Sequence, residues 1–232
     1  MILGKQRWND LLFLHWEVDA ALVQASLPAG LAVDTFGGKA YMGIVPFCME
    51  RVRPAFLPPL PWLSWFLELN VRTYVRDAHG APGVWFYSLD CNQPIGVMLA
   101  QSFFHLPYRH ARMTARRSDG LIQYRCQRRG NAPPAWDFAW RVPNASSQYA
   151  PASANTLSEF LVERYVLYCA DQHGALYKGR VSHTPYQIAE PTLIEHTTAP
   201  AALAGFVLSE PPVSVLAALA VDVNIHPLVR QR

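Results

Sequence analysis

Charge is scarce in this chain of 232 residues: 16% are Asp, Glu, Lys or Arg, whereas 51% are hydrophobic and 12% are aromatic. This composition excludes a disordered protein, because disordered segments combine high charge with few aromatic side chains. A long apolar run is also missing: the longest covers residues 213–221, and a bilayer span needs roughly 20 residues. We therefore expect a folded protein that has no membrane partner.

Closely spaced cysteine pairs are absent as well. The four cysteines are Cys48, Cys91, Cys126 and Cys169, and each stands alone in an apolar or strand-like run. Such residues are typical of free, buried thiols in a reducing compartment. The first residues of the chain also lack the apolar core of a secretory signal peptide. We therefore expect a cytoplasmic protein without disulfides.

The chain contains no GxGxxG, P-loop, GxSxG or HExxH motif, although a Ser-His-Asp arrangement remains open. His105 and His110 are five residues apart and lie on either side of Pro107. Metal ligands are usually spaced i and i+4 on a helix, or i and i+2 on a strand. We therefore expect no metal and no cofactor.

Aromatic and β-branched runs separated by turns dominate the chain. They predict strands over residues 40–53, 66–76, 84–91, 108–117, 121–129, 165–170 and 175–181. Helices are predicted over residues 20–27 after Asp19, over 94–104, after the capping box Thr156–Glu159, and over 213–220. Short, evenly spaced strands with few helices predict a mainly β, antiparallel barrel or sandwich. No long polar linker divides the chain, so we expect one domain over residues 1–232.

The most informative stretch is the strand predicted over residues 66–76. With a period of two, one of its faces carries Glu68, Asn70, Arg72 and Tyr74, while the other face is largely apolar. If the polar row points into a cavity, a carboxylate and a guanidinium at different depths suit a small organic acid. The alternative is an ordinary strand with its polar face half-solvated. Bulky residues on both faces of the next predicted strand favour the cavity.

Two junctions add further candidates. His105 and Tyr108 follow the helix predicted over residues 94–104, where Pro107 prevents its continuation, and this position suits the mouth of a barrel. His183 follows the last predicted hairpin, where it is either a general base or a structural loop histidine. Glu68 becomes a candidate general acid or base if burial raises its pKa.

Two segments of the sequence are candidate partner sites. Residues 105–130 hold seven arginines and one acid, Asp119. This arginine-rich segment could bind the phosphates of a nucleic acid. Solvated charges that protect strand edges explain it more simply, so we expect no nucleic-acid partner. The proline-rich segment 54–65 carries large apolar residues that include Phe56, Leu57, Leu60, Trp62 and Trp65. They favour self-association or a protein partner, although a lid over a cavity or a core-packing segment would also explain them.

Several motifs, in the same order along the chain, resemble the YqjF-like family, an uncharacterised domain family. They lie at residues 8–16 (WNDLLFLHW), 27–31 (LPAGL), 34–38 (DTFGG), 45–47 (VPF), 68–75 (ELNVRTYV), 83–90 (GVWFYSLD), 105–108 (HLPY) and 183–186 (HTPY). The family is similar in fold to acetoacetate decarboxylase. The resemblance therefore implies an antiparallel, barrel-like fold with a few peripheral helices around a polar cavity.

The same resemblance implies that the catalytic lysine is absent. In the decarboxylase, a lysine in a Pro-Lys-Lys motif forms a Schiff base with a β-keto acid, and the matching residues here are Pro107-Tyr108-Arg109. An arginine cannot replace it, because a guanidinium stays protonated. The chain has only three lysines, Lys5, Lys39 and Lys178. Among them, only Lys178, near Arg180, is a candidate for a buried site with a cationic partner. Glu68 resembles a pocket glutamate of the decarboxylase.

The leading hypothesis is a small-molecule-binding protein that holds a small organic acid. The predicted ligand-binding residues are Glu68, Asn70, Arg72, Tyr74, Tyr108 and His183, and the candidate catalytic residues are Glu68, Tyr108 and His105. One alternative is a lyase or proton-transfer enzyme that acts on keto or hydroxy acids without a Schiff base. Another is a homo-oligomeric or partner-binding protein that has no small ligand.

Overall fold

The computed structural model describes residues 1–95, 98, 105–130, 134–143, 148–208 and 211–231. The helices described there are short: α1 (Ala20–Ser26), α3 (Leu157–Val162) and α4 (Ala199–Ala202). No helix in this part of the chain has the length and apolar character to span a bilayer. The strands are β1 (Gly4–Asn9), β2 (Leu11–Val18), β3 (Leu31–Val33), β4 (Ala40–Pro54), β5 (Phe66–Asp77), β6 (Pro82–Cys91), β7 (Tyr108–Ser118), β8 (Leu121–Arg128), β9 (Trp136–Arg141), β10 (Ala150–Pro151), β11 (Val166–Ala170), β12 (Leu176–Ser182), β13 (Gln187–Ala189), β14 (Thr192–Glu195), β15 (Ser214–Ala218), β16 (Val221–Ile225) and β17 (Val229–Arg230).

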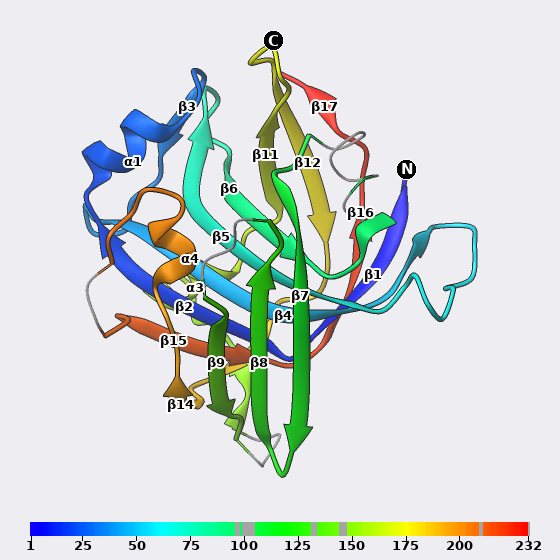
Figure 1. The fold of residues 1–232 in the computed structure, drawn as a ribbon. Helices are drawn as coiled ribbons and strands as arrows, with labels where there is room; N and C mark the ends of the chain where they lie inside the picture. The colour runs from blue at the N-terminus through cyan, green and yellow to red at the C-terminus, as the bar shows by residue number, and fades with distance from the viewer. Residues whose placement is uncertain (96–97, 99–104, 131–133, 144–147, 209–210, 232) are drawn as a thin grey trace.

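The strand pairings run in a closed circuit, from β1 through β4, β5, β6, β11, β12 and β16 back to β1 (Figure 1). The first half of β4 pairs with β2 and its second half pairs with β1. The predicted mainly β fold with a few short helices is confirmed. The sheet is mixed rather than purely antiparallel, because β6 pairs in parallel with both β7 and β11.

Two hydrophobic cores lie on opposite faces of β5. The outer core packs Leu69 and Val71 of β5 against β7, β8 and β9, which Figure 1 shows crossing in front of the circuit. The inner core contains Tyr74 of β5, Phe13 of β2 and Leu161 of α3. Side chains alternate between the faces of a strand, so Glu68, Asn70 and Arg72 share the inner face with Tyr74.

Most of the predicted elements form for the expected local reasons. Asp19 caps α1 by accepting from the backbone N–H of Ala21, and Thr156 caps α3 by accepting from that of Glu159. At the hairpin between β7 and β8, Asp119 and Gly120 both have a positive φ, as a type I′ turn requires. Every strand predicted from the sequence is present, with small shifts in its bounds.

The helix predicted over residues 213–220 is wrong. Ser214–Ala218 forms strand β15, which pairs along its length with β2 and at its end with β13. A strand there satisfies the backbone groups on that edge of β2, and this tertiary pairing outweighs the helical preference of an Ala- and Leu-rich run. The helix predicted over residues 94–104 falls mostly outside the described residues.

Candidate functional site

The polar row of β5 is buried. Glu68, Asn70, Arg72 and Tyr74 are all nearly inaccessible, and even the guanidinium-bearing Arg72 is only 8% exposed. This burial excludes the alternative of a half-solvated strand face. The row is continued across the sheet by β4, where Gly43 lies opposite both Arg72 and His15 of β2. A side chain at Gly43 would press on both residues, so the glycine makes room for them.

Arg72 is surrounded by neutral groups. Its Nη2 donates to the backbone oxygen of Leu161 at 3.0 Å and to the hydroxyl of Tyr74 at 3.4 Å. Its guanidinium carbon lies 5.4 Å from the ring centroid of Phe13 and 5.7 Å from that of Tyr74. No acidic side chain in the described part of the chain pairs with it, and its Nε has no hydrogen-bond partner there. Arg72 is therefore a buried positive charge that has no counter-ion among the residues that the structure describes.

His15 lies beside this charge and is neutral. Burial, together with the charge of Arg72, holds the pKa of His15 well below its usual value. The Tyr74 hydroxyl donates to Leu161 O at 2.8 Å and lies 2.7 Å from His15 Nε2. Because that hydroxyl has one proton, His15 Nε2 must carry the hydrogen between the two groups. Nδ1 of His15 then remains a buried acceptor without a described partner.

His183 is connected to the side chains around Arg72 through Tyr186. Its ring centroid lies 4.5 Å from that of Tyr186, which in turn lies 5.4 Å from that of Phe13. Burial lowers the pKa of His183, and Nδ1 of the neutral ring donates to the backbone oxygen of Thr184 at 2.7 Å. Nε2 of His183 is therefore a second buried acceptor without a described partner, and the side-chain oxygen of Asn70 is a third.

Glu68 and Tyr108 form a separate pair at the other end of the row. The Tyr108 hydroxyl donates to Glu68 Oε2 at 2.8 Å. Burial raises the pKa of Glu68 to about 7, with a smaller rise from the charge of Asp90, while the bond from Tyr108 lowers it. The carboxyl can therefore gain or lose a proton near neutral pH.

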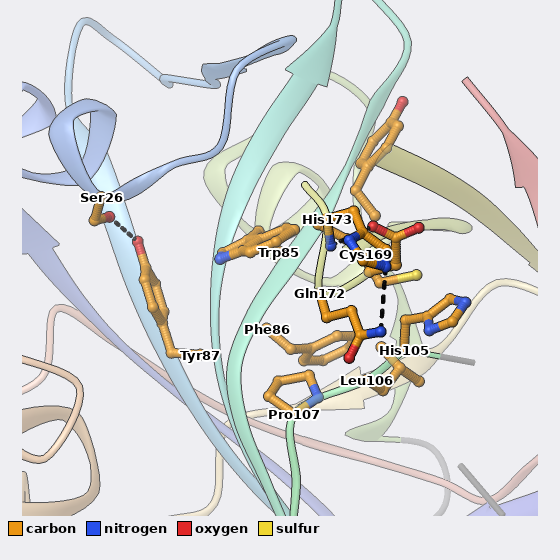
Figure 2. Close-up of a pocket in the computed structure, with 13 residues that line it drawn as sticks. Ser26, Trp85, Phe86, Tyr87, His105, Leu106, Pro107, Cys169, Gln172 and His173 are labelled. Atoms are coloured by element: carbon orange, nitrogen blue, oxygen red, sulfur yellow. Dashed lines mark hydrogen bonds between the residues drawn. The ribbon is translucent and has the colours of Figure 1, made fainter. Parts of the chain in front are cut away.

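His105 does not share these partners. Its ring centroid lies 5.0 Å from that of Tyr177, and it lines a groove of about 750 Å³ whose walls also include Trp85, Phe86, Pro107, Cys169 and His173 (Figure 2). The structure therefore gives His105 and Tyr108, which are close in sequence, different surroundings. The sequence predicts His105 at the mouth of a barrel; in the structure it lines this groove.

The groove lies where β6 and β11 separate. These strands pair only through Val84–Trp85 and Leu167–Tyr168, after which β6 pairs with β7 instead. Phe86 stands opposite Arg72 in the β5–β6 ladder, so the two side chains share the inner face. Phe86 thus belongs both to the groove wall and to the face that carries Arg72.

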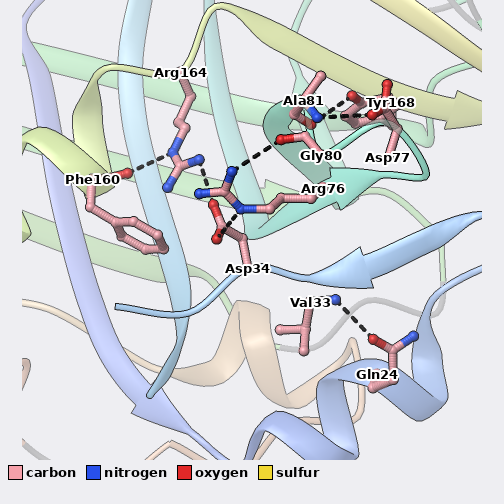
Figure 3. Close-up of polar contacts among 10 residues, drawn as sticks. All are labelled: Gln24, Val33, Asp34, Arg76, Asp77, Gly80, Ala81, Phe160, Arg164 and Tyr168. Atoms are coloured by element: carbon pink, nitrogen blue, oxygen red, sulfur yellow. Dashed lines mark hydrogen bonds and ion pairs between the residues drawn. The ribbon is translucent and has the colours of Figure 1, made fainter. Parts of the chain in front are cut away.

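Helix α3 is anchored so that its backbone reaches Arg72. Arg164, just after α3, donates to Asp34 Oδ2 at 2.7 Å and to the backbone oxygen of Phe160 at 2.6 Å, while Arg76 of β5 donates to Asp34 Oδ1 (Figure 3). Asp34 and Arg164 are both buried, so their ion pair fixes the end of the helix firmly. It thereby positions Leu161, whose carbonyl oxygen accepts from both Arg72 and Tyr74.

None of the three lysines is suited to form a Schiff base. Lys178 donates to Asp77 at 2.9 Å, and Lys39 donates to Glu17 at 2.7 Å in an exposed pair. Lys5 is exposed on β1. A nucleophilic lysine needs a buried position or a neighbouring cation that favours its neutral form, and a carboxylate partner does the opposite. In the described part of the chain, no group of three His, Cys, Asp or Glu residues is arranged to hold a metal ion.

Comparisons with known proteins agree with this fold. The chain is similar in structure, with a TM-score of 0.68 and 14% identity, to acetoacetate decarboxylase from Legionella pneumophila, over 99% of this chain and 88% of that one. It is similar, with a TM-score of 0.67 and 12% identity, to the enduracididine biosynthesis enzyme MppR complexed with pyruvate, over 99% of this chain and 91% of that one. An acetoacetate decarboxylase-like enzyme from Sphingomonas wittichii RW1 gives a TM-score of 0.67 at 14% identity, over 100% and 94% of the two chains. At these identities the likeness shows the fold alone.

Sequence comparison establishes the family. The uncharacterized protein YqjF of Bacillus subtilis (strain 168) is 37% identical over 182 residues, which cover 78% of this chain and 73% of YqjF. Residues 5–222 match the model of the DUF2071 family, described as an uncharacterized conserved protein. The expected YqjF-like membership is confirmed, and the chain belongs to the DUF2071 family.

Proposed function

We propose that this protein binds a small organic acid inside the strand circuit, with Arg72 as the residue that holds its carboxylate. The observation that carries the proposal is the buried guanidinium of Arg72, which has no carboxylate partner in the described chain. An unpaired buried charge is strongly unfavourable, and arginine cannot lose its proton to avoid it. A ligand carboxylate would supply the missing negative charge.

The neutral groups around Arg72 suit the rest of such a ligand. His15 Nδ1, Asn70 Oδ1 and His183 Nε2 are buried acceptors that could each receive a hydrogen bond from a hydroxyl or an acid proton. Phe13 and Tyr186 supply apolar walls. A hydroxy acid combines these features: a carboxylate for Arg72, a hydroxyl that can donate to one of these acceptors, and a short carbon chain. Pyruvate is a natural first probe, because the structurally similar enzyme MppR is complexed with it.

Thermal unfolding with and without ligand tests the proposal. At a concentration of about 100 times Kd, a ligand stabilises the folded state by about 2.7 kcal/mol, which raises Tm by roughly 5–10 °C in a chain of this size. We expect this shift in the wild type with at least one acid from a panel of pyruvate, longer keto acids, hydroxy acids and aromatic acids. Arg72→Met keeps the side-chain bulk, removes the charge and abolishes the shift.

Arg112→Met is the matched control, because Arg112 is an exposed arginine on β7. It should respond to the acid as the wild type does. The proposal fails if no acid in the panel shifts the wild type, or if Arg72→Met shifts as much as the control.

A second candidate function is proton transfer on a longer keto or hydroxy acid. The observation that favours it is the Glu68–Tyr108 pair, because the pKa of Glu68 is about 7 and the group can exchange a proton at neutral pH. Four residues along a strand span roughly 13 Å, so a ligand that reaches from Arg72 to Glu68 must be longer than pyruvate. In an activity assay on any acid that binds, Glu68→Gln should retain binding and lose turnover; retained turnover would exclude this function.

A further inference from the structure

The loop between β4 and β5 has an apolar surface. Residues 54–65 include no charged side chain, and Figure 1 shows this loop projecting from the side of the molecule. Phe56 is 84% exposed and Trp62 is 68% exposed, and three further large apolar residues of the loop, Leu57, Leu60 and Trp65, are also exposed. A projecting group of exposed aromatic and aliphatic side chains indicates an interaction surface.

The loop is held in this outward arrangement. The Ser64 hydroxyl accepts from the backbone N–H of Leu60 at 2.8 Å, and the Ser64 carbonyl accepts from that of Val52 at 3.1 Å. The Gln93 side chain donates to the backbone oxygen of Trp62 at 3.1 Å. Four prolines between residues 54 and 61 further restrict the backbone. Because the loop is already ordered, little conformational entropy is lost when its side chains dock.

Basic residues stand at the base of the loop. Arg53 on β4 lies directly opposite Lys5 on β1, and Arg51 is two residues away on the same strand. None of the three forms an ion pair with another residue that the structure describes. Like charges directly opposite each other in a sheet are destabilising. An external negative charge would relieve this repulsion.

We propose that this face docks on an anionic lipid surface, with the apolar side chains of loop 54–65 in the headgroup region and Lys5, Arg51 and Arg53 against the headgroups. Trp and Phe favour the membrane interface, and basic residues beside an apolar element strengthen binding to anionic lipids. A second copy of the chain fits less well. A two-fold contact through this loop would bring the two basic groups together.

This docking needs no membrane-spanning segment. The sequence-based expectation that the chain has no membrane partner came from the lack of a long apolar run, which excludes a span but not a surface contact. The inference is independent of the proposed organic-acid site, because it involves neither Arg72 nor any other residue of the inner core.

Co-sedimentation with vesicles tests the inference. We expect the wild type to bind phosphatidylcholine vesicles that contain phosphatidylglycerol more tightly than phosphatidylcholine alone. The double variant Phe56→Ser/Trp62→Ser should weaken this binding at least tenfold. Arg51→Gln/Arg53→Gln should weaken it roughly 25-fold, since each basic residue near an anionic surface contributes about a fivefold gain in affinity. Raising the ionic strength from about 0.1 M to about 1 M should release the protein, because the Debye length falls from about 10 Å to about 3 Å.

The control variant Leu22→Ser/Val207→Ser replaces exposed apolar residues elsewhere on the surface and should bind as the wild type does. Equal melting temperatures would show that each variant is folded. The inference is overturned if the wild type does not bind anionic vesicles, or if the control variant loses binding as strongly as Phe56→Ser/Trp62→Ser. It is also overturned if light scattering shows a self-associated wild type that Phe56→Ser/Trp62→Ser converts to a monomer, because the loop would then bind a second copy.

Discussion

Replacing Glu68 with glutamine should change how the stability of the protein depends on pH. Burial raises the pKa of the Glu68 carboxyl from 4.5 to about 7 in the folded chain, and Asp90 adds to the rise. The unfolded chain releases the same proton near the ordinary value. Between these two pKa values the folded state binds more protons than the unfolded state, so the free energy of unfolding falls as the pH rises.

The size of this effect follows from the shift. Each pKa unit corresponds to about 1.4 kcal/mol, so Glu68 alone contributes about 3 kcal/mol to stability. That contribution is fully present below pH 4.5, declines as the pH rises towards 7, and is absent at higher pH. Glu68 is almost fully buried, so solvent screening does not reduce the figure.

Urea unfolding at a series of pH values between about 4.5 and 8 measures this contribution. Glu68→Gln keeps the side-chain size and an oxygen that can accept from Tyr108, but it removes the titration. Relative to the wild type, the variant should gain about 3 kcal/mol over this pH range. Any constant cost of the buried amide shifts the whole curve without changing its slope, and other titrating groups cancel in the difference.

Tyr108→Phe provides a second test of the pKa of Glu68. The hydrogen bond from Tyr108 lowers the pKa of Glu68, so its loss should raise that pKa further and move the transition to higher pH. The reasoning is refuted if the difference between Glu68→Gln and the wild type stays constant within about 0.5 kcal/mol across the range.

Three further substitutions or modifications test the packing around the site. Arg128→Met leaves the fully buried Asp90 without the partner that donates to both of its oxygens, and in urea unfolding it should cost about 3–5 kcal/mol at neutral pH and less in acid, where Asp90 is protonated. Gly83→Ala places a Cβ 2.6 Å from Tyr168 and should cost about 1–3 kcal/mol in the same measurement. Burial raises the pKa of Cys91 to about 12, so peptide mapping should find it alkylated by iodoacetamide only when the chain unfolds.

The strands could be predicted wherever their signal was local. The alternation along β5 and the Asp-Gly turn after β7 can be recognised in a single stretch of sequence. The run at residues 11–16 gave no alternation, because β2 lies between the outer and inner cores and is buried on both faces. The prediction of a helix over residues 213–220 was wrong for a related reason. The segment forms a strand because it pairs with β2, and its own residues do not indicate that pairing.

The candidate site could be predicted in part for the same reason. The polar row of β5 follows from its period of two, but His15 lies in an apolar run and meets Tyr74 only across the sheet. The arginine-rich hairpin shows a similar limit. Arg117 pairs with Asp10 and Arg128 with Asp90, and both acids lie far away in the sequence. These partners are distant in sequence, so the pattern within one strand could not predict them.

The buried ionisable groups on and beside the inner face of β5 differ in whether they can become neutral. Burial drives Glu68 towards its protonated form and His15 towards its neutral form, so each escapes much of the cost of a charge inside the protein. Arg72 has no such route, because a guanidinium remains charged at any ordinary pH. Among the described residues, its cost is reduced by the carbonyl of Leu161, the hydroxyl of Tyr74 and the surrounding aromatic faces. A bound anion offsets that cost directly, and this is why binding of an acid at Arg72 comes before proton transfer at Glu68 in our proposal.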